Sequence, residues 1–255
     1  MIKIKNEEQI AILRENALLV SKTLAEVGKH IAPGIATKQL DRIAEDFIRS
    51  HGAVPGFLGY GGFPYSLCIS VNDVVVHGFP SDYELQEGDI VSVDCGTKLK
   101  GFYGDSAYTF PVGKISDEDQ RLLDVTKASL YLGIEKAVEG NRTGDIGSTI
   151  QTYVENEGFT VVREMVGHGL GANMHEDPEV PNYGTAGRGK KLSEGMVICI
   201  EPMVNAGTRN IYLHDNGWGV ATIDKKKSAH FELTVCIRKG KPEILSTYEF
   251  IENIK

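Results

Sequence analysis

The sequence IVSVDCGTKLKGFYGDSAYTF, from Ile90 to Phe110, has the composition of a β-hairpin. Its first arm is rich in valine, its second arm is rich in Tyr, Thr and Phe, and a turn is expected between them at 97–101. With the turn centred between Leu99 and Lys100, Asp94 lies directly opposite Asp105 and both side chains leave the same face. The hairpin therefore predicts two carboxylates side by side on one sheet surface.

Two carboxylates so close together require a compensating interaction. Their Cβ atoms would be about 5 Å apart, and like charges at that distance destabilise a strand pair. A divalent cation between them is one explanation, because carboxylate oxygens are hard ligands. The alternative is an exposed hairpin face whose acids point into water, and a β-bulge in either arm would change the register. The remaining sequence decides between them by supplying further ligands or not.

The composition is that of a folded protein with a sizeable core. The 255 residues are 41% hydrophobic, which is enough for one large domain or two fused halves. No apolar run follows the basic residues of MIKIKNEEQIAILRENA, and nowhere do about 18 uncharged apolar residues follow one another. We therefore expect a cytoplasmic protein without a membrane span. The net charge of −8 argues against nucleic acid as the main partner. The four cysteines form no CxxC pair and are expected to be reduced and buried.

Apolar residues at spacings of three and four predict four helices. Thr37 and Ser116 are expected to cap the second and the third, and Thr143 to open the fourth. The expected helices cover about 6–30, 37–52, 116–134 and 143–158, and the expected strands besides the hairpin include 67–71, 74–76, 159–166, 197–200 and 230–235. Two helices followed by strands occur twice in this order. The pattern predicts a single catalytic domain, 1–255, made of two related halves at about 1–115 and 116–255.

Five acids and imidazoles interrupt or end the apolar strand runs: Asp94, Asp105, His168, Glu201 and Glu232. Four carboxylates gathered inside a protein repel one another and are costly to desolvate, which predicts bound cations, two rather than one. One imidazole with four carboxylates is an oxygen-rich donor set that suits Mn, Fe or Co and is compatible with Zn. Two bridged metals lower the pKa of a shared water, which is typical of hydrolases.

Several segments together make the sequence similar to the methionine aminopeptidases of the short bacterial type (type I). They are VVVHGFP, SVDCGTKLKGFYGDSAYTF, MVGHGLG, MHEDPEVPNYG, VICIEPMVNAG, DNGWGVAT and the Glu of HFELTV. The resemblance covers essentially the whole chain. It implies the pita-bread (creatinase/aminopeptidase) fold, an α/β (α+β) fold with pseudo-twofold symmetry in which helices back a curved antiparallel sheet. It also implies two divalent metal ions per chain, Co, Mn, Fe or Zn.

The resemblance gives each proposed metal ligand a role. Asp94 would chelate one metal, His168 and Glu201 the other, and Asp105 and Glu232 would bridge both. In such enzymes the metals activate a water molecule that attacks the first peptide carbonyl, and Glu201 would carry the proton.

The resemblance also implies residues that contact the substrate. His175 would stabilise the oxyanion, and His77 would contact the substrate backbone at the scissile amide. An unbranched apolar pocket would take the methionine side chain, and ordinary core packing is the alternative for each of its members. The implied pocket consists of Phe57, Tyr60, Phe63, Cys68, Met174, Met203 and Trp218. Four positions, Val76, Met174, His230 and Leu233, depart from the pattern of the best-known bacterial members and bear on the pocket and the surroundings of the metals.

The implied function is removal of the N-terminal methionine from nascent proteins and peptides whose second residue is small. We expect a cytoplasmic monomer, with docking at the ribosomal exit as a further expectation. One alternative is a proline-directed relative, a Xaa-Pro aminopeptidase or prolidase. These usually carry an additional N-terminal domain, for which the roughly 90 residues before Asp94 leave no room. A second alternative is a binding protein that kept the fold and lost catalysis, against which the intact ligands and the acidic charge argue.

Overall fold

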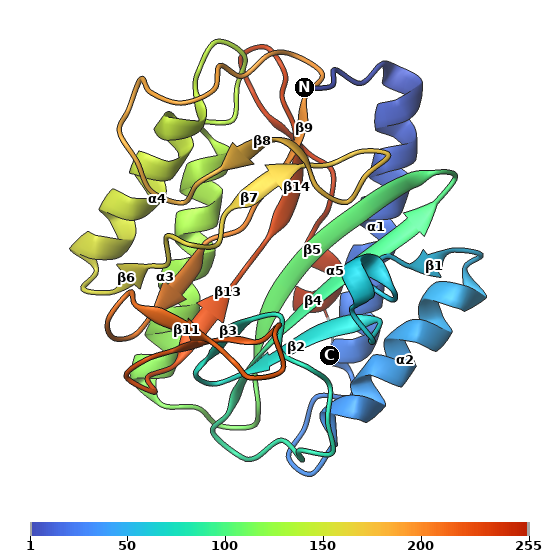
Figure 1. Cartoon of the computed structure of the whole chain (residues 1–255), viewed down its shortest axis with the longest axis vertical. Coiled ribbons are helices and arrows are strands. Elements are labelled where there is room, and N and C mark those ends of the chain that lie inside the picture. Colours follow the sequence, from blue (N-terminus) through green and yellow to red (C-terminus); the bar gives the residue numbers. More distant parts are fainter. Residues whose placement is uncertain (1, 254–255) are drawn as a thin grey trace.

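The strands lie between two pairs of helices in the computed structural model, which describes residues 2–253 (Figure 1). Helices α1 (Glu7–Gly28) and α2 (Thr37–Ser50) lie on one side, and α3 (Asp117–Ile134) and α4 (Thr143–Asn156) lie on the other. All four match the helices predicted from apolar spacing. Within residues 2–253 no helix combines the length and the apolar character that crossing a bilayer needs.

Helix caps follow the sequence at α3 but not at α2. The Ser116 hydroxyl accepts a hydrogen bond from the Asp119 backbone N–H, as predicted. At α2 the N-cap is Ala36, which makes no side-chain cap. Thr37 is the first helical residue, and its hydroxyl donates to the Ser81 carbonyl and accepts from the Ser81 backbone N–H. The predicted cap at Thr37 is wrong because a loop distant in sequence takes up the hydroxyl.

The predicted hairpin forms from β4 (Ile90–Leu99) and β5 (Phe102–Pro111). Leu99 pairs with Phe102, so the turn has only two residues. These are Lys100 and Gly101, with φ of 52° and 81°. Positive φ at both central positions is the requirement of a type I′ turn, whose twist matches that of the strands.

The register of the hairpin differs from the prediction by two residues. Asp94 pairs with Ala107, and Asp105 pairs with Gly96, so the predicted direct opposition of the two aspartates is wrong. A shift of two residues keeps every side chain on its face, because side chains alternate with a period of two. The aspartates are therefore diagonal neighbours on one face, which relieves their direct repulsion and keeps them close.

The other strands complete four sheets. The hairpin sheet also contains β1 (Val54–Pro55) and β2 (Leu67–Val71), both paired with β4. The largest sheet has the order β15-β14-β9-β7-β8. Its strands are β15 (Glu243–Ile244), β14 (Leu233–Cys236), β9 (Val197–Ile200), β7 (Gly167–Gly169) and β8 (Glu176–Val180). A smaller sheet has the order β13 (Ser228–His230), β10 (Met203–Asn205) and β6 (Thr160–Val161). Another has the order β11 (Ile211–Leu213), β12 (Val220–Thr222) and β3 (Val74–Val76). Short helices form at η1 (Tyr60–Gly62) and α5 (Glu249–Glu252).

Two predicted strands are shorter than expected. The run 159–166 is strand only at Thr160–Val161. The run 230–235 is divided between β13 and β14, which are separated at Phe231-Glu232. The break occurs because Glu232 leaves the ladder of β14 and pairs with the hairpin instead.

This pairing of Glu232 joins the hairpin to the second half of the chain. Ala107 and Glu232 form an antiparallel bridge, in which the Glu232 backbone N–H donates to the Ala107 carbonyl at 3.0 Å. The Tyr248 hydroxyl lies 2.8 Å from the carbonyl oxygens of both bridge residues. Since Ala107 also pairs with Asp94, which pairs with Cys68 of β2, four neighbouring segments place Cys68, Asp94, Ala107 and Glu232 in one row.

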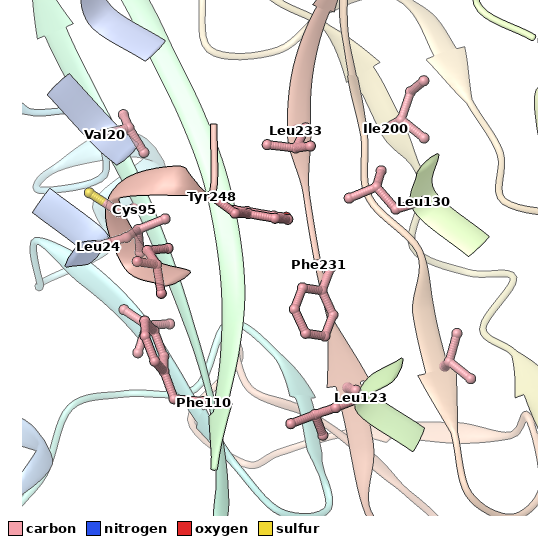
Figure 2. Packing of buried hydrophobic residues seen from close by; sticks show 14 of the residues in the cluster. Val20, Leu24, Cys95, Phe110, Leu123, Leu130, Ile200, Phe231, Leu233 and Tyr248 are labelled. Atoms are coloured by element: carbon pink, nitrogen blue, oxygen red, sulfur yellow. The ribbon is translucent and has the colours of Figure 1, made fainter. Parts of the chain in front are cut away.

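Apolar side chains from both halves pack around this junction (Figure 2). Leu24 of α1 and Leu130 of α3 are fully buried, and Phe231 and Tyr248 are 1% exposed. The Tyr248 ring lies 4.9 Å from that of Tyr108 in an edge-to-face arrangement. This shared core, rather than helix propensity, holds the helices against the strands.

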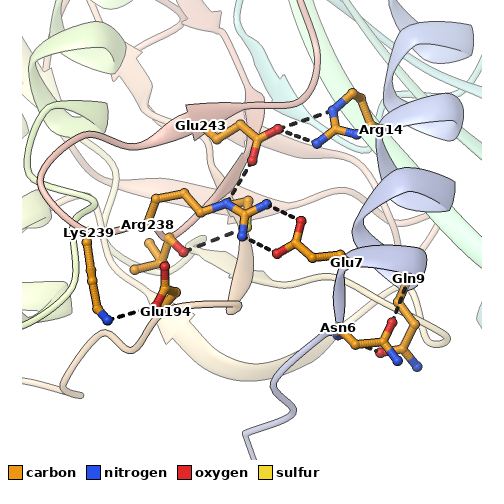
Figure 3. A network of polar contacts seen from close by, with 10 residues as sticks. Asn6, Glu7, Gln9, Arg14, Glu194, Arg238, Lys239 and Glu243 are labelled. Atoms are coloured by element: carbon orange, nitrogen blue, oxygen red, sulfur yellow. Dashed lines mark hydrogen bonds and ion pairs between the residues drawn. The ribbon is translucent and has the colours of Figure 1, made fainter.

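The start of α1 is fixed by polar contacts (Figure 3). The Asn6 side chain accepts from the Gln9 backbone N–H, and the Gln9 side chain accepts from the Asn6 backbone N–H, which makes a capping box. Next to it, Arg238 donates to both carboxylate oxygens of Glu7 and to Glu243. These contacts bind the first turn of α1 to the segment between β14 and β15.

Removing the Tyr248 hydroxyl tests the junction. In Tyr248→Phe the two bridge carbonyls lose a buried partner, so the free energy of unfolding in urea should fall by about 1–2 kcal/mol. Tyr131→Phe is the matched control, because Tyr131 is 39% exposed and packs against Tyr248. We expect its effect to stay within about 0.5 kcal/mol. Equal losses of unfolding free energy in the two variants would show that the Tyr248 hydroxyl does not stabilise the bridge.

Candidate metal centre

Five side chains from both halves converge on one cavity of about 270 Å³. They are the predicted ligands: Asp94 and Asp105 from the hairpin, His168 from β7, Glu201 directly after β9, and Glu232 directly before β14. Asp105 and Glu232 are 3% and 2% exposed. Because Leu233 pairs with Ile200, Glu201 and Glu232 lie next to each other at the same end of the two paired strands.

The donor atoms of this site lie at distances that a bound ion would span. The His168 Nε2 atom is 3.6 Å from Asp105 Oδ2 and 3.6 Å from Glu201 Oε1. Ligand atoms of Asp105, His168 and Glu232 all lie within 4.8 Å of one another. The structure therefore brings together the residues that the sequence singled out separately.

Three carboxylate oxygens in the site have no hydrogen-bond partner among the described residues. They are Asp94 Oδ1, Asp105 Oδ1 and Glu232 Oε1, and all are buried. A buried oxygen without a donor costs free energy, and native structures rarely keep several in one place. These oxygens face a cavity without a Lys or Arg among its lining residues. A cation satisfies all three at once.

Electrostatics give the same result. Burial raises the pKa of Asp94, and burial together with mutual repulsion raises the pKa values of Asp105, Glu201 and Glu232 well above their ordinary range. The metal-free site thus retains protons that isolated carboxyls would release. A divalent cation reverses this effect because its charge stabilises the ionised forms.

The imidazole of His168 is held in the form that binds metals. Its Nδ1 atom is 3.0 Å from the Gly169 carbonyl oxygen, and because a carbonyl only accepts, Nδ1 carries the hydrogen. Burial lowers the pKa of His168 to about 4, so the ring is neutral at neutral pH. Its Nε2 lone pair then faces carboxylate oxygens, an arrangement that is unfavourable without a cation between them.

Cys199 also lies within this group of donor atoms. Burial and the nearby charges of Glu232 and Asp105 raise the pKa of its thiol well above the ordinary value, and metals bind the thiolate. Its sulfur lies 3.7 Å from the Thr234 hydroxyl. Cys199 is fully buried and, unlike the five predicted ligands, does not line the cavity, so we do not count it among them. All four cysteines are buried and unpaired, as predicted.

Two further histidines line the cavity. His77 follows β3 with a φ of 58°, an unusual conformation that turns the chain at the cavity wall. Burial lowers the pKa of His77 to about 4 and also lowers that of His175. The His175 ring lies 4.3 Å from that of His168, and its Nδ1 atom is 2.8 Å from the Tyr60 hydroxyl. Both imidazoles are thus neutral hydrogen-bonding groups beside the ligands.

The predicted apolar pocket forms only in part. Phe57, Tyr60, Phe63, Cys68 and Trp218 line the cavity, and the Phe63 and Trp218 rings meet edge to face at 5.1 Å. Met174 and Met203 do not line it. Met174 is fully buried in the same cluster as Phe57, and Met203 packs with Val75 and Val76 in a separate cluster.

Comparison with known proteins identifies the family. The model of metallopeptidase family M24 matches residues 11–239. The chain belongs to this family. An M24 relative named methionine aminopeptidase, from Clostridium perfringens, is 54% identical over 246 residues, which are 96% of this chain and 99% of the relative. Since the two sequences align over nearly their full lengths, this M24 peptidase belongs with the methionine aminopeptidases.

Solved structures support the same placement of this M24 peptidase. The crystal structure of methionine aminopeptidase from Rickettsia prowazekii matches with a TM-score of 0.96 at 41% identity, covering 97% of this chain and 100% of that one. The prolidase from Pyrococcus horikoshii shares the fold, with a TM-score of 0.79 at 23% identity, and this chain covers 64% of it. The predicted α/β pita-bread fold is confirmed. Family membership and the buried donor cluster together support use of divalent metal.

Sequence reasoning missed part of the M24 cavity. Glu164, Met165 and Val166 contribute to its wall from the segment that precedes β7. Met165 lies three residues before His168, and an unbranched apolar side chain this close in sequence to a predicted ligand is the signal that would have found it. The sequence predicts that 164–166 is the end of a strand, but in the structure these residues are not part of a strand.

Metal removal and pH test the centre. Burial raises the pKa of Asp94 from 3.8 to about 7 in the metal-free protein. A raised carboxyl pKa stabilises the fold at low pH, and the contribution is lost as the pH rises through the folded-state value. The Tm of the metal-free protein, relative to that of metal-free Asp94→Asn, should therefore fall between about pH 4 and pH 7.

Adding Mn²⁺ or Co²⁺ should reverse this loss. A metal at a hundredfold excess over its Kd stabilises by about 2.7 kcal/mol, and the shift in Tm should be larger at pH 7 than at pH 5 because ligands must be deprotonated. Differential scanning calorimetry measures both effects. A relative Tm that rises with pH, with no response to either metal, would rule out the centre.

Proposed function

We propose that this chain removes the N-terminal methionine from peptides and nascent proteins whose second residue is small. The observation that carries the proposal is the buried carboxylate and imidazole cluster, which lies beside a cavity walled by Phe63, Trp218 and Cys68. Aromatic and sulfur-containing walls suit an unbranched thioether side chain. The methionine side chain would occupy the apolar part of this cavity of about 270 Å³, beside the groups proposed for catalysis.

The proposed ligands are Asp94, Asp105, His168, Glu201 and Glu232, holding two divalent cations of Mn, Co, Fe or Zn. Four carboxylates in one buried cluster carry enough negative charge to balance two dications, which supports the number. When bound, such ions activate a water molecule and polarise the scissile carbonyl. The hard oxygens of the carboxylates and one neutral imidazole match these metals.

Three residues are proposed to handle protons and charge. Glu201, whose carboxylate lies 3.6 Å from His168 Nε2 among the proposed ligands, would carry the proton from water to the leaving amine. Neutral His175 would donate a hydrogen bond to the developing oxyanion. Neutral His77, a half-buried residue that also lines the cavity, would hold the substrate backbone at the scissile amide.

Two residues lie against Glu201, one at its backbone and one at its carboxylate. The Asn182 side chain donates to the Glu201 carbonyl at 3.0 Å, and the His230 Nε2 atom lies 3.7 Å from Glu201 Oε2. His230 is 2% exposed. An imidazole at this position would orient the carboxylate on the side away from His168, which gives a role to one of the positions that depart from the common bacterial pattern.

The setting of the reaction is proposed from the same features. A net charge of −8 and the match in length to bacterial relatives fit a monomer of one catalytic domain, with halves at about 1–115 and 116–255, that acts on new chains in the cytoplasm. Docking at the ribosomal exit would place it where free N-termini emerge. Nucleic acid and membranes are not proposed as partners of the site.

A peptide assay tests the proposed function against its enzymatic alternative. Supplied with Mn²⁺, Co²⁺ or Fe²⁺, the protein should release methionine from Met-Ala-Ser and should spare its formylated form, because the free amine must reach the site. Peptides with a bulky second residue should react at least about tenfold more slowly. Preferred cleavage of a Xaa-Pro peptide would support a proline-directed enzyme, and no turnover with any dication would support a binding protein.

Substitution of the two neutral histidines tests their proposed roles. His175→Ala and His77→Ala should each lower kcat for Met-Ala-Ser by about a hundredfold, because a preorganised donor is lost. Metal content by elemental analysis should stay near the wild-type value. His51→Ala, at the exposed end of α2, is the control and should leave kcat within about twofold. Loss of bound metal in His77→Ala would instead make His77 a ligand.

A further inference from the structure

A buried ion pair lies directly behind the cavity wall. Glu176 follows His175 in the sequence, and its side chain is only 2% exposed. The Lys5 ammonium, on a side chain 5% exposed, donates to Glu176 Oε2 at 2.9 Å. Among the Lys and Arg ion pairs of residues 2–253, this one is the most buried. The pair connects the start of the chain to a loop of the second half.

The Glu176 carboxylate also organises its own loop. Its other oxygen, Oε1, accepts from the Asn173 backbone N–H at 3.2 Å. It lies so close to Gly171 that a Cβ at that position would come within 2.7 Å of it. The carboxylate thus fills the inside of the 171–176 loop, and any larger residue at 171 would displace it.

The Lys5 end of the pair is anchored independently of Glu176. The Lys5 backbone N–H donates to the Gly195 carbonyl at 2.8 Å. The next residue, Asn6, begins the capping box of α1, and Glu7 is bound by Arg238 (Figure 3). The backbone of Lys5 is therefore fixed, and its ammonium holds Glu176 and the 171–176 loop in one place.

His175 lies between two fixed residues of that loop. Before it, Met174 is fully buried. After it, Glu176 is held by Lys5. The His175 ring packs against the ring of His168 at 4.3 Å, and its Nδ1 atom lies 2.8 Å from the Tyr60 hydroxyl. When the phenol donates to Nδ1, the hydrogen of the neutral ring resides on Nε2, which is the atom left to donate to a substrate oxygen.

We propose that the Lys5–Glu176 ion pair is a positioning device for His175, which fixes the loop that aims its imidazole at the reacting carbonyl. The inference rests on the proposed function, and it adds two residues that do not touch the substrate. Stability alone does not account for the pair, because burying two charges is on average no better than burying apolar groups of the same size. Its specific contribution is to fix the orientation of the loop that carries His175, through charge-assisted hydrogen bonds.

The pair persists over the neutral pH range. Burial by itself would raise the pKa of Glu176, but the hydrogen bonds from Lys5 and Lys3 outweigh burial and hold the pKa below its ordinary value. The carboxylate thus remains ionised wherever the protein is assayed near neutrality. Lys3, whose side chain is 52% exposed, donates to Oε1 at 3.0 Å and offers a matched comparison, since exposed ion pairs contribute little.

Steady-state kinetics of the full chain with metal test the device. Lys5→Met should lower kcat for Met-Ala-Ser about tenfold and leave KM within about twofold, because the His175 contact is realised in the transition state. Lys3→Met should keep both parameters within about twofold. Assays well below the Tm of each variant exclude losses caused by unfolding.

Hydrogen exchange supplies a measurement that does not depend on activity. In Lys5→Met the amides of 171–176 should exchange at least about tenfold faster than in the wild-type protein, while those of the β4–β5 hairpin stay unchanged. The apolar pair Lys5→Met with Glu176→Leu should recover Tm but keep the lowered kcat, since it restores packing without restoring direction.

The outcomes separate the two levels of the proposal. A Lys5→Met protein with wild-type kcat, or one impaired equally with Lys3→Met, would overturn the positioning role. If Lys5→Met does not fold, Glu176→Gln, which keeps the shape of the side chain, carries the same expected loss in kcat and in exchange protection. A wild-type protein inactive on Met-Ala-Ser would refute the proposed function instead, and the exchange measurement would still decide whether the pair holds the loop.

Discussion

Repulsion among buried carboxylates is the constraint on which this structure depends. Asp94, Asp105, Glu201 and Glu232 share one cavity with a neutral imidazole, and three of their oxygens lack a hydrogen-bond donor within the described chain. Such a cluster is unfavourable in a low-dielectric interior unless protons or cations neutralise it. The fold is therefore built to be completed by metal, and the divalent metal use that family M24 implies follows from the charges themselves.

The architecture meets this constraint by drawing the proposed ligands from segments far apart in the chain. The hairpin supplies two aspartates as diagonal neighbours, and the second half supplies His168 and both glutamates. The Ala107–Glu232 bridge joins the halves, and the small side chain of Ala107 stands between Asp94 and Glu232 in the row across the sheet. A shared apolar core packs around that bridge. The burial of these apolar side chains, and not contacts within the charged cluster, keeps the carboxylates together.

Positions outside the cavity contribute to the site in the same way. The Gly169 carbonyl fixes the His168 ring, and Asn182 holds the backbone carbonyl of Glu201. We propose that the Lys5–Glu176 pair positions His175 in a similar way. Each of these supports comes from a segment distant in sequence or from the backbone. In the proposed mechanism these supports orient His168, Glu201 and His175 without touching the substrate, and fixed orientation of this kind lowers the cost of charge development in preorganised sites.

The sequence by itself determined the helices, the donor set and the common face of Asp94 and Asp105. Helical spacing and strand alternation are local periodicities, so Asp94 and Asp105 remain on one face even though the predicted register was two residues away from the observed one. Only the tertiary structure decided the register, the use of the Thr37 hydroxyl by the Ser81 loop, the exclusion of Met174 and Met203 from the cavity, and the contact of Lys5 with Glu176. These depend on distances between segments far apart in the chain, which packing sets and no local pattern encodes.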